Sequence, residues 1–173
     1  MILYHGTDIN SAQNIFNNKQ INVYFGKKYC DFGPGFYMTD NKDEAINWSK
    51  KKARLMKRSP AVITLDFDYS SAEPFIEKFE QDLRWGQFVI NNRTGLEYIA
   101  LMANKENNLD RKYHITCGKI ADKGVTRLAP VLKSEKKPLT SLTGLVGKKT
   151  ETQYVLHTTF ATTFVKIISY CKY

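Results

Sequence analysis

The segment 61–68, Ala-Val-Ile-Thr-Leu-Asp-Phe-Asp, constrains the fold more than any other part of the chain. Its alternation of apolar and polar residues predicts a β-strand with one buried face. Shorter strands are expected at 2–5, 20–25, 36–39, 113–120, 154–157 and 165–170. Helices are expected at 9–17, 41–58, 80–92, 95–104, 125–133 and 159–164. Because these elements follow no regular β-α-β order and no domain boundary is evident, we predict a single α+β domain over residues 1–173.

Two of the expected helices have candidate N-terminal caps. Asp8 precedes the first helix, and Asp40 precedes the long second one. In the second helix, Ala45, Trp48 and Met56 are expected on the face that packs against the sheet.

The charge balance favours an anionic partner. The chain carries 26 Lys and Arg against 17 Asp and Glu, a net charge of +9. This excess would attract a dinucleotide, a nucleic acid or an acidic protein. The basic run Lys50–Arg58 is dense enough to contact phosphates, although such a run is more often a solvated face with lysine stems packed over the sheet.

The cysteine pattern favours a reducing compartment. Cys30, Cys117 and Cys171 form no Cys-x-x-Cys pair, and their odd number leaves one thiol unpaired. The sequence shows no apolar run long enough for a membrane span and no pattern typical of a signal peptide at its start. We therefore expect a cytoplasmic protein without a membrane partner.

The conventional signatures of cofactor and metal chemistry are missing. The sequence has neither a Gly-x-Gly-x-x-Gly motif nor a phosphate-binding P-loop. Its histidines and cysteines do not follow metal-ligand spacing, so no metal is expected. The unusual features are instead two polar and aromatic clusters on expected strands, Leu-Tyr-His-Gly-Thr at 3–7 and Asp-Phe-Gly-Pro-Gly-Phe-Tyr-Met-Thr at 31–39.

These clusters resemble the ADP-ribosyltransferase superfamily. Residues 3–7 are similar to the opening strand of poly(ADP-ribose) polymerases and diphtheria-toxin-like transferases, and residues 32–40 are similar to their glycine-loop strand. Thr-Gln-Tyr-Val-Leu at 152–156 resembles the third element of that family, with Gln153 where the family carries glutamate. The whole chain also resembles an uncharacterised family of small bacterial domains related to these transferases, with 113–122 and 153–158 as counterparts of that family's segments.

The resemblance implies a fold and a cofactor. The fold would consist of two small packed mixed sheets, flanked by helices, with a cleft for NAD⁺ between them. NAD⁺ would act as co-substrate, and the catalytic constellation would be His5, Tyr37 and Gln153. Taken singly, His5 and Tyr37 are more typical of core residues, so the prediction depends on the three motifs occurring together.

The resemblance also implies roles for individual residues in binding NAD⁺. Tyr37 would stack on the nicotinamide ring, and Trp48 would form a second wall. His5 would donate a hydrogen bond to a ribose hydroxyl, and the Gly6 backbone would pair with the nicotinamide amide.

The NAD⁺ site would extend to neighbouring residues. Thr7 and Gly35 lie inside the two motifs and would help to hold the cofactor, and the loop with Lys27 and Lys28 would cover the pyrophosphate. The motif-matching segments also contain His157 and Asp122, for which the sequence indicates no role.

The neutral Gln153 narrows the expected reaction. It offers the oxocarbenium-like transition state no full negative charge and cannot serve as a general base. Since loss of this glutamate accompanies single-unit transfer in related enzymes, the resemblance implies mono-ADP-ribosylation of a protein or nucleic acid. It further implies a bacterial toxin or defence effector, which a neutralising antitoxin partner would control.

Three other functions remain open at this stage. The same fold could act as an NAD⁺ glycohydrolase with water as acceptor. It could also be a catalytically inactive module that binds nucleic acid through its basic face. The third alternative, removal of a 2′-phosphate from RNA, ranks last because that chemistry uses more basic residues than these motifs supply.

Overall fold

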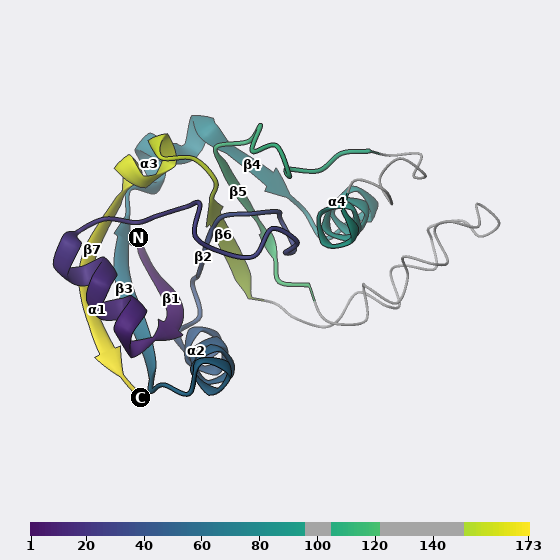
Figure 1. Cartoon of the computed structure of the whole chain (residues 1–173). Coiled ribbons are helices and arrows are strands. Elements are labelled where there is room, and N and C mark those ends of the chain that lie inside the picture. Colours follow the sequence, from purple (N-terminus) through teal and green to yellow (C-terminus); the bar gives the residue numbers. More distant parts are fainter. Residues whose placement is uncertain (96–104, 122–150) are drawn as a thin grey trace.

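The computed structural model of the chain describes residues 1–95, 105–121 and 151–173 and has an α+β architecture (Figure 1). Its strands are β1 (Ile2–Asp8), β2 (Phe36–Thr39), β3 (Pro60–Phe67), β4 (Ile76–Phe79), β5 (Ile115–Lys119), β6 (Thr152–Leu156) and β7 (Val165–Lys172). Its helices are α1 (Ile9–Asn18), α2 (Lys42–Met56), α3 (Tyr69–Ala72) and α4 (Leu83–Thr94), with short 3₁₀ turns η1 (Glu73–Phe75) and η3 (Phe160–Phe164). The expected helices at 95–104 and 125–133 lie almost wholly or wholly outside the described residues.

The strands form one sheet in the order β4-β5-β6-β2-β1-β3-β7, in which β4 and β5 are parallel and all other neighbours antiparallel. The expectation of two packed sheets is therefore wrong. However, β1 and β2 pair only through Tyr4 and Thr39, whereas β1 pairs with β3 along its whole length. The sheet is thus continuous but nearly divided in its middle.

Two clusters of buried side chains form the core. The first includes Leu3, Ile63 and Met38 together with Ala12 of α1. The second includes Val155 of β6 and Trp85 of α4. The first cluster lies where apolar residues of the strands meet α1 and α3, and the second where they meet α4, which is how a mixed sheet buries its two faces.

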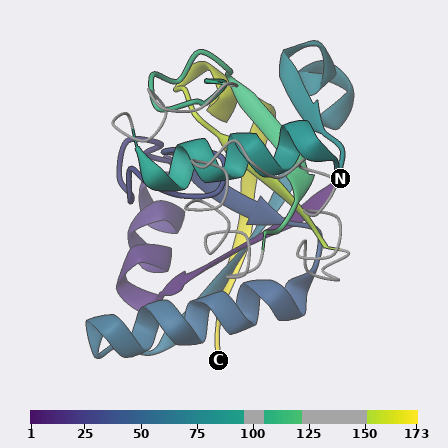
Figure 2. The ribbon, with the colours of Figure 1, turned by 90° about the vertical axis from the view of Figure 1, so that its right-hand side faces the viewer.

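The helices α2 and α4 cover the same side of the sheet. Antiparallel partners such as Tyr4 and Thr39 point to one face, and residues two apart along a strand share it. Gly6, which contacts α2, therefore shares a face with Val155, which packs near α4. Figure 2 views this side, with α4 crossing above and α2 below.

The local sequence explains most helix starts. The Asp8 side chain accepts a hydrogen bond from Ser11 N at 3.2 Å, so the predicted cap of α1 is confirmed. The predicted cap of α2 is wrong, because Asn41 rather than Asp40 accepts from the amides of Asp43 and Glu44, at 2.9 and 3.1 Å. Asn41 is the residue immediately before the first helical turn, and its amide oxygen bonds like a carboxylate oxygen there.

The expected strand at 20–25 is absent. This segment is irregular, although Ile21 and Val23 are buried in the first cluster. Their alternation therefore reflects two anchoring side chains and not a hydrogen-bonded ladder. The chain continues from this segment through a loop to Phe32, which is fully buried in the second cluster.

No helix among the described residues is long and apolar enough to cross a membrane.

Candidate functional site

His5, Tyr37 and Gln153 lie on the three neighbouring strands β1, β2 and β6 at the middle of the sheet. In the register of β2 and β6, Gln153 pairs with Thr39 and Val155 pairs with Tyr37. The side chains of Tyr37 and Gln153 therefore share a face, which is the one that α2 and α4 cover. His5 and Gln153 are 148 positions apart in the sequence, but the three residues lie on adjacent strands.

His5 bridges the point where the pairing of β1 and β2 ends. Its Nδ1 lies 2.6 Å from the Tyr37 carbonyl oxygen, and its ring stacks on Phe36 with the centroids 4.0 Å apart. Because a carbonyl oxygen only accepts, Nδ1 carries the proton and Nε2 is an acceptor. Burial, with a smaller contribution from the Lys52 charge, lowers the pKa of His5 to about 4. The ring is therefore neutral, and Nε2 would accept from a ribose hydroxyl, opposite to the expected direction.

Tyr37 is fixed by the loop that precedes it. Its hydroxyl donates to Gly33 O at 2.6 Å and accepts from Phe32 N at 3.0 Å. Burial holds the pKa of the Tyr37 hydroxyl well above its ordinary value, so the side chain stays neutral. The ring packs on the second cluster, whereas the adjacent Phe36 belongs to the first. The rings of His5 and Tyr37 therefore meet opposite sides of β2.

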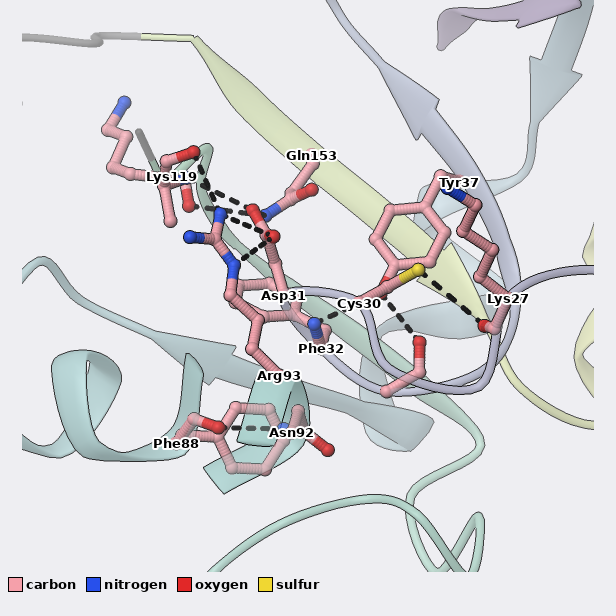
Figure 3. Close-up of polar contacts among 12 residues, drawn as sticks. Lys27, Cys30, Asp31, Phe32, Tyr37, Phe88, Asn92, Arg93, Lys119 and Gln153 are labelled. Atoms are coloured by element: carbon pink, nitrogen blue, oxygen red, sulfur yellow. Dashed lines mark hydrogen bonds and ion pairs between the residues drawn. The ribbon is translucent and has the colours of Figure 1, made fainter. Parts of the chain in front are cut away.

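Gln153 belongs to a polar network that the sequence did not reveal (Figure 3). Its Nε2 donates to Asp31 Oδ2 at 3.3 Å and to Lys119 O at 3.4 Å. Asp31 forms an ion pair with Arg93 of α4 at 2.7 Å and accepts from Ala121 N at 3.3 Å. The network ties the glycine-rich loop to α4 and to the end of β5, and it fixes the orientation of the Gln153 amide.

The motif glycines serve packing. A Cβ on Gly6 would lie 2.0 Å from Ala45 O, so this glycine lets α2 approach β1. A Cβ on Gly35 would lie 2.6 Å from Leu156 O, which places this glycine tightly against β6. The space beside the Gly6 Cα is therefore occupied by α2.

Thr7 is buried and hydrogen-bonded, and Lys52 Nζ of α2 donates to its hydroxyl oxygen at 2.8 Å. Burial lowers the pKa of Lys52. The Thr7 hydroxyl, which was expected to help hold the cofactor, is therefore already engaged in a contact with α2. Lys27 and Lys28 are both exposed on the loop before β2, and Lys28 Nζ lies 5.6 Å from the Tyr29 ring centroid.

The prediction that Trp48 faces the sheet is wrong. Its side chain is 52% exposed, and Lys51 Nζ lies 4.8 Å from its ring centroid. The buried face of α2 is formed by smaller residues such as Ala45, Ser49 and Ala53. Met56 is likewise half exposed, so helical rotation moves both large side chains out of the core. We therefore remove Trp48 from the proposed nicotinamide pocket.

His157 has a structural role. It is fully buried, with Nδ1 2.7 Å from Pro34 O and Nε2 2.8 Å from Thr116 Oγ1. Burial lowers its pKa to about 4. Arg111 adds bonds to His157 O at 2.6 Å and Pro34 O at 3.4 Å, closing the seam between β6 and the loop. Asp122 lies outside the described residues.

Within the described part of the chain, no group of three or more His, Cys, Asp or Glu side chains is placed to hold a metal ion. The polar groups at the centre of the sheet are neutral donors and acceptors, together with the Asp31–Arg93 pair. Such a set suits recognition of hydroxyl and amide groups.

Fold and site together define an α+β domain with a polar site on three central strands. The chain belongs to the family described as "Protein of unknown function (DUF3990)", whose model matches residues 1–167. No curated protein matches the chain.

Proposed function

We propose that this protein is a mono-ADP-ribosyltransferase that uses NAD⁺ as co-substrate. The observation that carries the proposal is the meeting of His5, Tyr37 and Gln153 on β1, β2 and β6, where the sheet is nearly divided. The resemblance to ADP-ribosyltransferases links the three motifs to NAD⁺, and the motifs lie far apart in the sequence. Their strands are adjacent, and a ligand in the gap between β1 and β2 could contact the His5 ring on one side of β2 and the Tyr37 and Gln153 side chains on the other.

The near-division of the sheet supports a place for nicotinamide. Pairing of β1 with β2 is limited to Tyr4 and Thr39, so the β1 edge from His5 to Thr7 has backbone groups that β2 does not pair. Backbone donors and acceptors require partners. A carboxamide, which has one acceptor and two donors, would bind the Gly6 backbone as a further strand does.

The proposed reaction breaks the bond between nicotinamide and C1′ of the ribose. The bond's electron pair leaves with the nicotinamide nitrogen, and C1′ becomes oxocarbenium-like. An acceptor oxygen or nitrogen then bonds to C1′ and loses its proton to solvent. His5 Nε2 and the Gln153 amide oxygen would bind ribose hydroxyls, while Tyr37 would hold the nicotinamide ring.

The Asp31–Arg93 pair sets the electrostatics of this step. Asp31 bonds to Gln153 but is itself paired with Arg93, so the network contributes little net negative charge. The site therefore works by holding substrate groups in place and by oriented dipoles. This fits transfer of a single unit to an acceptor that is itself a competent nucleophile.

The test is incubation of the purified protein with labelled NAD⁺ and a cell extract, followed by separate protease and nuclease digestion. Label should enter macromolecules, and Tyr37→Ala should abolish the transfer while unfolding stays cooperative. Nicotinamide release without any labelled macromolecule would select the glycohydrolase instead. Absence of both, or undiminished transfer by the Tyr37→Ala variant, would contradict the proposal.

A further inference from the structure

The outward side of α2 carries large apolar side chains that the fold does not bury. Trp48 is 52% exposed, Leu55 is 73% exposed and Met56 is 54% exposed. Residues 48 and 55 are seven positions apart, so they lie along one stripe of the helix. Three large apolar side chains exposed on one 15-residue helix are typical of a contact surface.

The same helix is strongly basic in its second half. Residues 50–58 contain six Lys and Arg and no Asp or Glu. Among the described residues, Arg58 alone of these six forms a salt bridge, with Asp8 at 3.1 Å, while Lys52 bonds to Thr7. The other four are exposed: Lys50, Lys51, Arg54 and Lys57. This concentration of exposed positive charge calls for a polyanionic partner.

The exposed stripe borders the candidate site. Trp48 and Lys52 are four residues apart and therefore neighbours on one flank of α2. Lys52 reaches Thr7, and Gly6 touches Ala45, so this flank adjoins the β1 edge that carries His5. A molecule lying on Trp48 would reach the region where we place the ribose.

The chemistry of this surface fits a nucleic acid better than an acidic protein. A flat ring with a cation over it is a platform for base stacking, and Lys51 Nζ already lies 4.8 Å from the Trp48 ring centroid. The exposed cations from residue 50 to residue 57 extend over roughly 10 Å of helix, enough for successive phosphates. An acidic protein would use the exposed lysines and arginine but would have no need of the exposed Trp48 ring.

We propose that the exposed side of α2, from Trp48 on one flank through Lys51 and Arg54 to Lys50 and Lys57 on the other flank, binds a single-stranded nucleic acid as the acceptor of the transfer. We call this side the α2 surface. This inference rests on the proposed function only in naming the nucleic acid as the acceptor of ADP-ribose. Binding itself can be measured without NAD⁺, so the two proposals can fail separately.

The two tryptophans make the test direct. Trp85 is fully buried, whereas Trp48 is half exposed, so a stacking base should quench the fluorescence of Trp48 alone. The protein is titrated with an RNA and a DNA oligonucleotide of about 12 nucleotides, and with polyglutamate, at several salt concentrations. Quenching by the oligonucleotides and weaker binding at higher salt are expected. The Trp48→Phe variant should bind nearly as well while losing the quenching signal.

Two variants locate the contact, with binding followed by anisotropy of a labelled oligonucleotide. Trp48→Ala should weaken binding roughly 10-fold or more through lost stacking. The double variant Lys51→Ala/Arg54→Ala should reduce the slope of log K against log salt by about 1.4. The matched control, Lys112→Ala/Lys166→Ala, removes the same charge from exposed residues outside α2 and should leave that slope nearly unchanged. A thermal melt checks that each variant is folded.

The proposal would be overturned by oligonucleotide binding that ignores Trp48→Ala, or by equal effects of the two double variants. Polyglutamate binding as tight as RNA binding would also overturn it in favour of an acidic protein. Label that enters protein alone would reject the nucleic acid as acceptor while leaving the transferase intact. Oligonucleotide binding without any NAD⁺ turnover would support the surface and contradict the proposed function instead.

Discussion

The surroundings of His5 and of His157 differ although the two residues have much in common. Both rings donate Nδ1–H to a backbone carbonyl, at 2.6 Å for His5 and 2.7 Å for His157, and burial lowers both pKa values to about 4. His157 also uses its second nitrogen, on Thr116. His5 instead stacks on Phe36 at the point where two strands separate. A perturbed pKa alone therefore does not distinguish the structural His157 from His5, whereas the partner of the second nitrogen does.

The largest expected effect is the loss of stability on replacing His157, the structural histidine of the two. His157→Ala removes two buried hydrogen bonds and leaves a cavity, so the free energy of unfolding should fall by about 3–4 kcal/mol. For a chain of this size the melting temperature should fall by roughly 10 °C. His114, which is exposed and bonds to Thr158, is the control, and His114→Ala should cost under about 1 kcal/mol. Equal losses in the two variants would remove the structural role from His157.

The next effect is the response to acid. His5 and His157 each have a folded-state pKa near 4, below the ordinary value of 6.5, so the unfolded chain takes up the proton first. Stability is therefore full above pH 6.5 and falls as the pH drops toward 4, by up to about 3 kcal/mol for His157. Denaturant unfolding across this range should show a flatter curve for the non-titrating His157→Gln variant. An unchanged slope would show that other groups set the acid response.

The third effect concerns His5 and should appear in activity. His5→Ala should lower NAD⁺ turnover about 100-fold, equivalent to about 2.7 kcal/mol, because it removes an acceptor at the ribose. Its stability cost should be smaller, about 1 kcal/mol, since only one hydrogen bond and one ring contact are lost. Nicotinamide release and a thermal melt measure the two quantities. A variant with full turnover and a large loss of stability would show that His5 has a structural role like that of His157.

The sequence predicts the central strands and their key residues because those features are local. The alternation at 61–68 matches β3, and the Asp8 cap lies within three residues of the amide that it binds. The motifs around residues 5 and 37 fall on β1 and β2 as expected. Each of these depends on residues close together in the chain.

The rest depends on contacts that no local pattern records. Asp31 and Arg93 are 62 residues apart, and neither spacing nor composition links a loop aspartate to a helix arginine. Gly6 is needed because Ala45 O approaches it, which becomes visible only once α2 is docked. Trp48 is only three residues from the buried Ala45 but is 52% exposed, because the buried face of α2 passes through Ala45, Ser49 and Ala53.

The smallest expected effect separates the two functions that we assign to Tyr37. Tyr37→Phe keeps the ring for nicotinamide but removes the hydroxyl that bonds to Gly33 O and Phe32 N. The loop should loosen at a cost of about 1 kcal/mol, which raises the KM for NAD⁺ about 5-fold and leaves kcat nearly unchanged. Steady-state nicotinamide release over a range of NAD⁺ concentrations measures both constants. A fall in kcat with an unchanged KM would place the hydroxyl in the reaction instead. Tyr37 would then resemble His5, for which we propose a role in the site, more than His157, which holds a loop against the sheet.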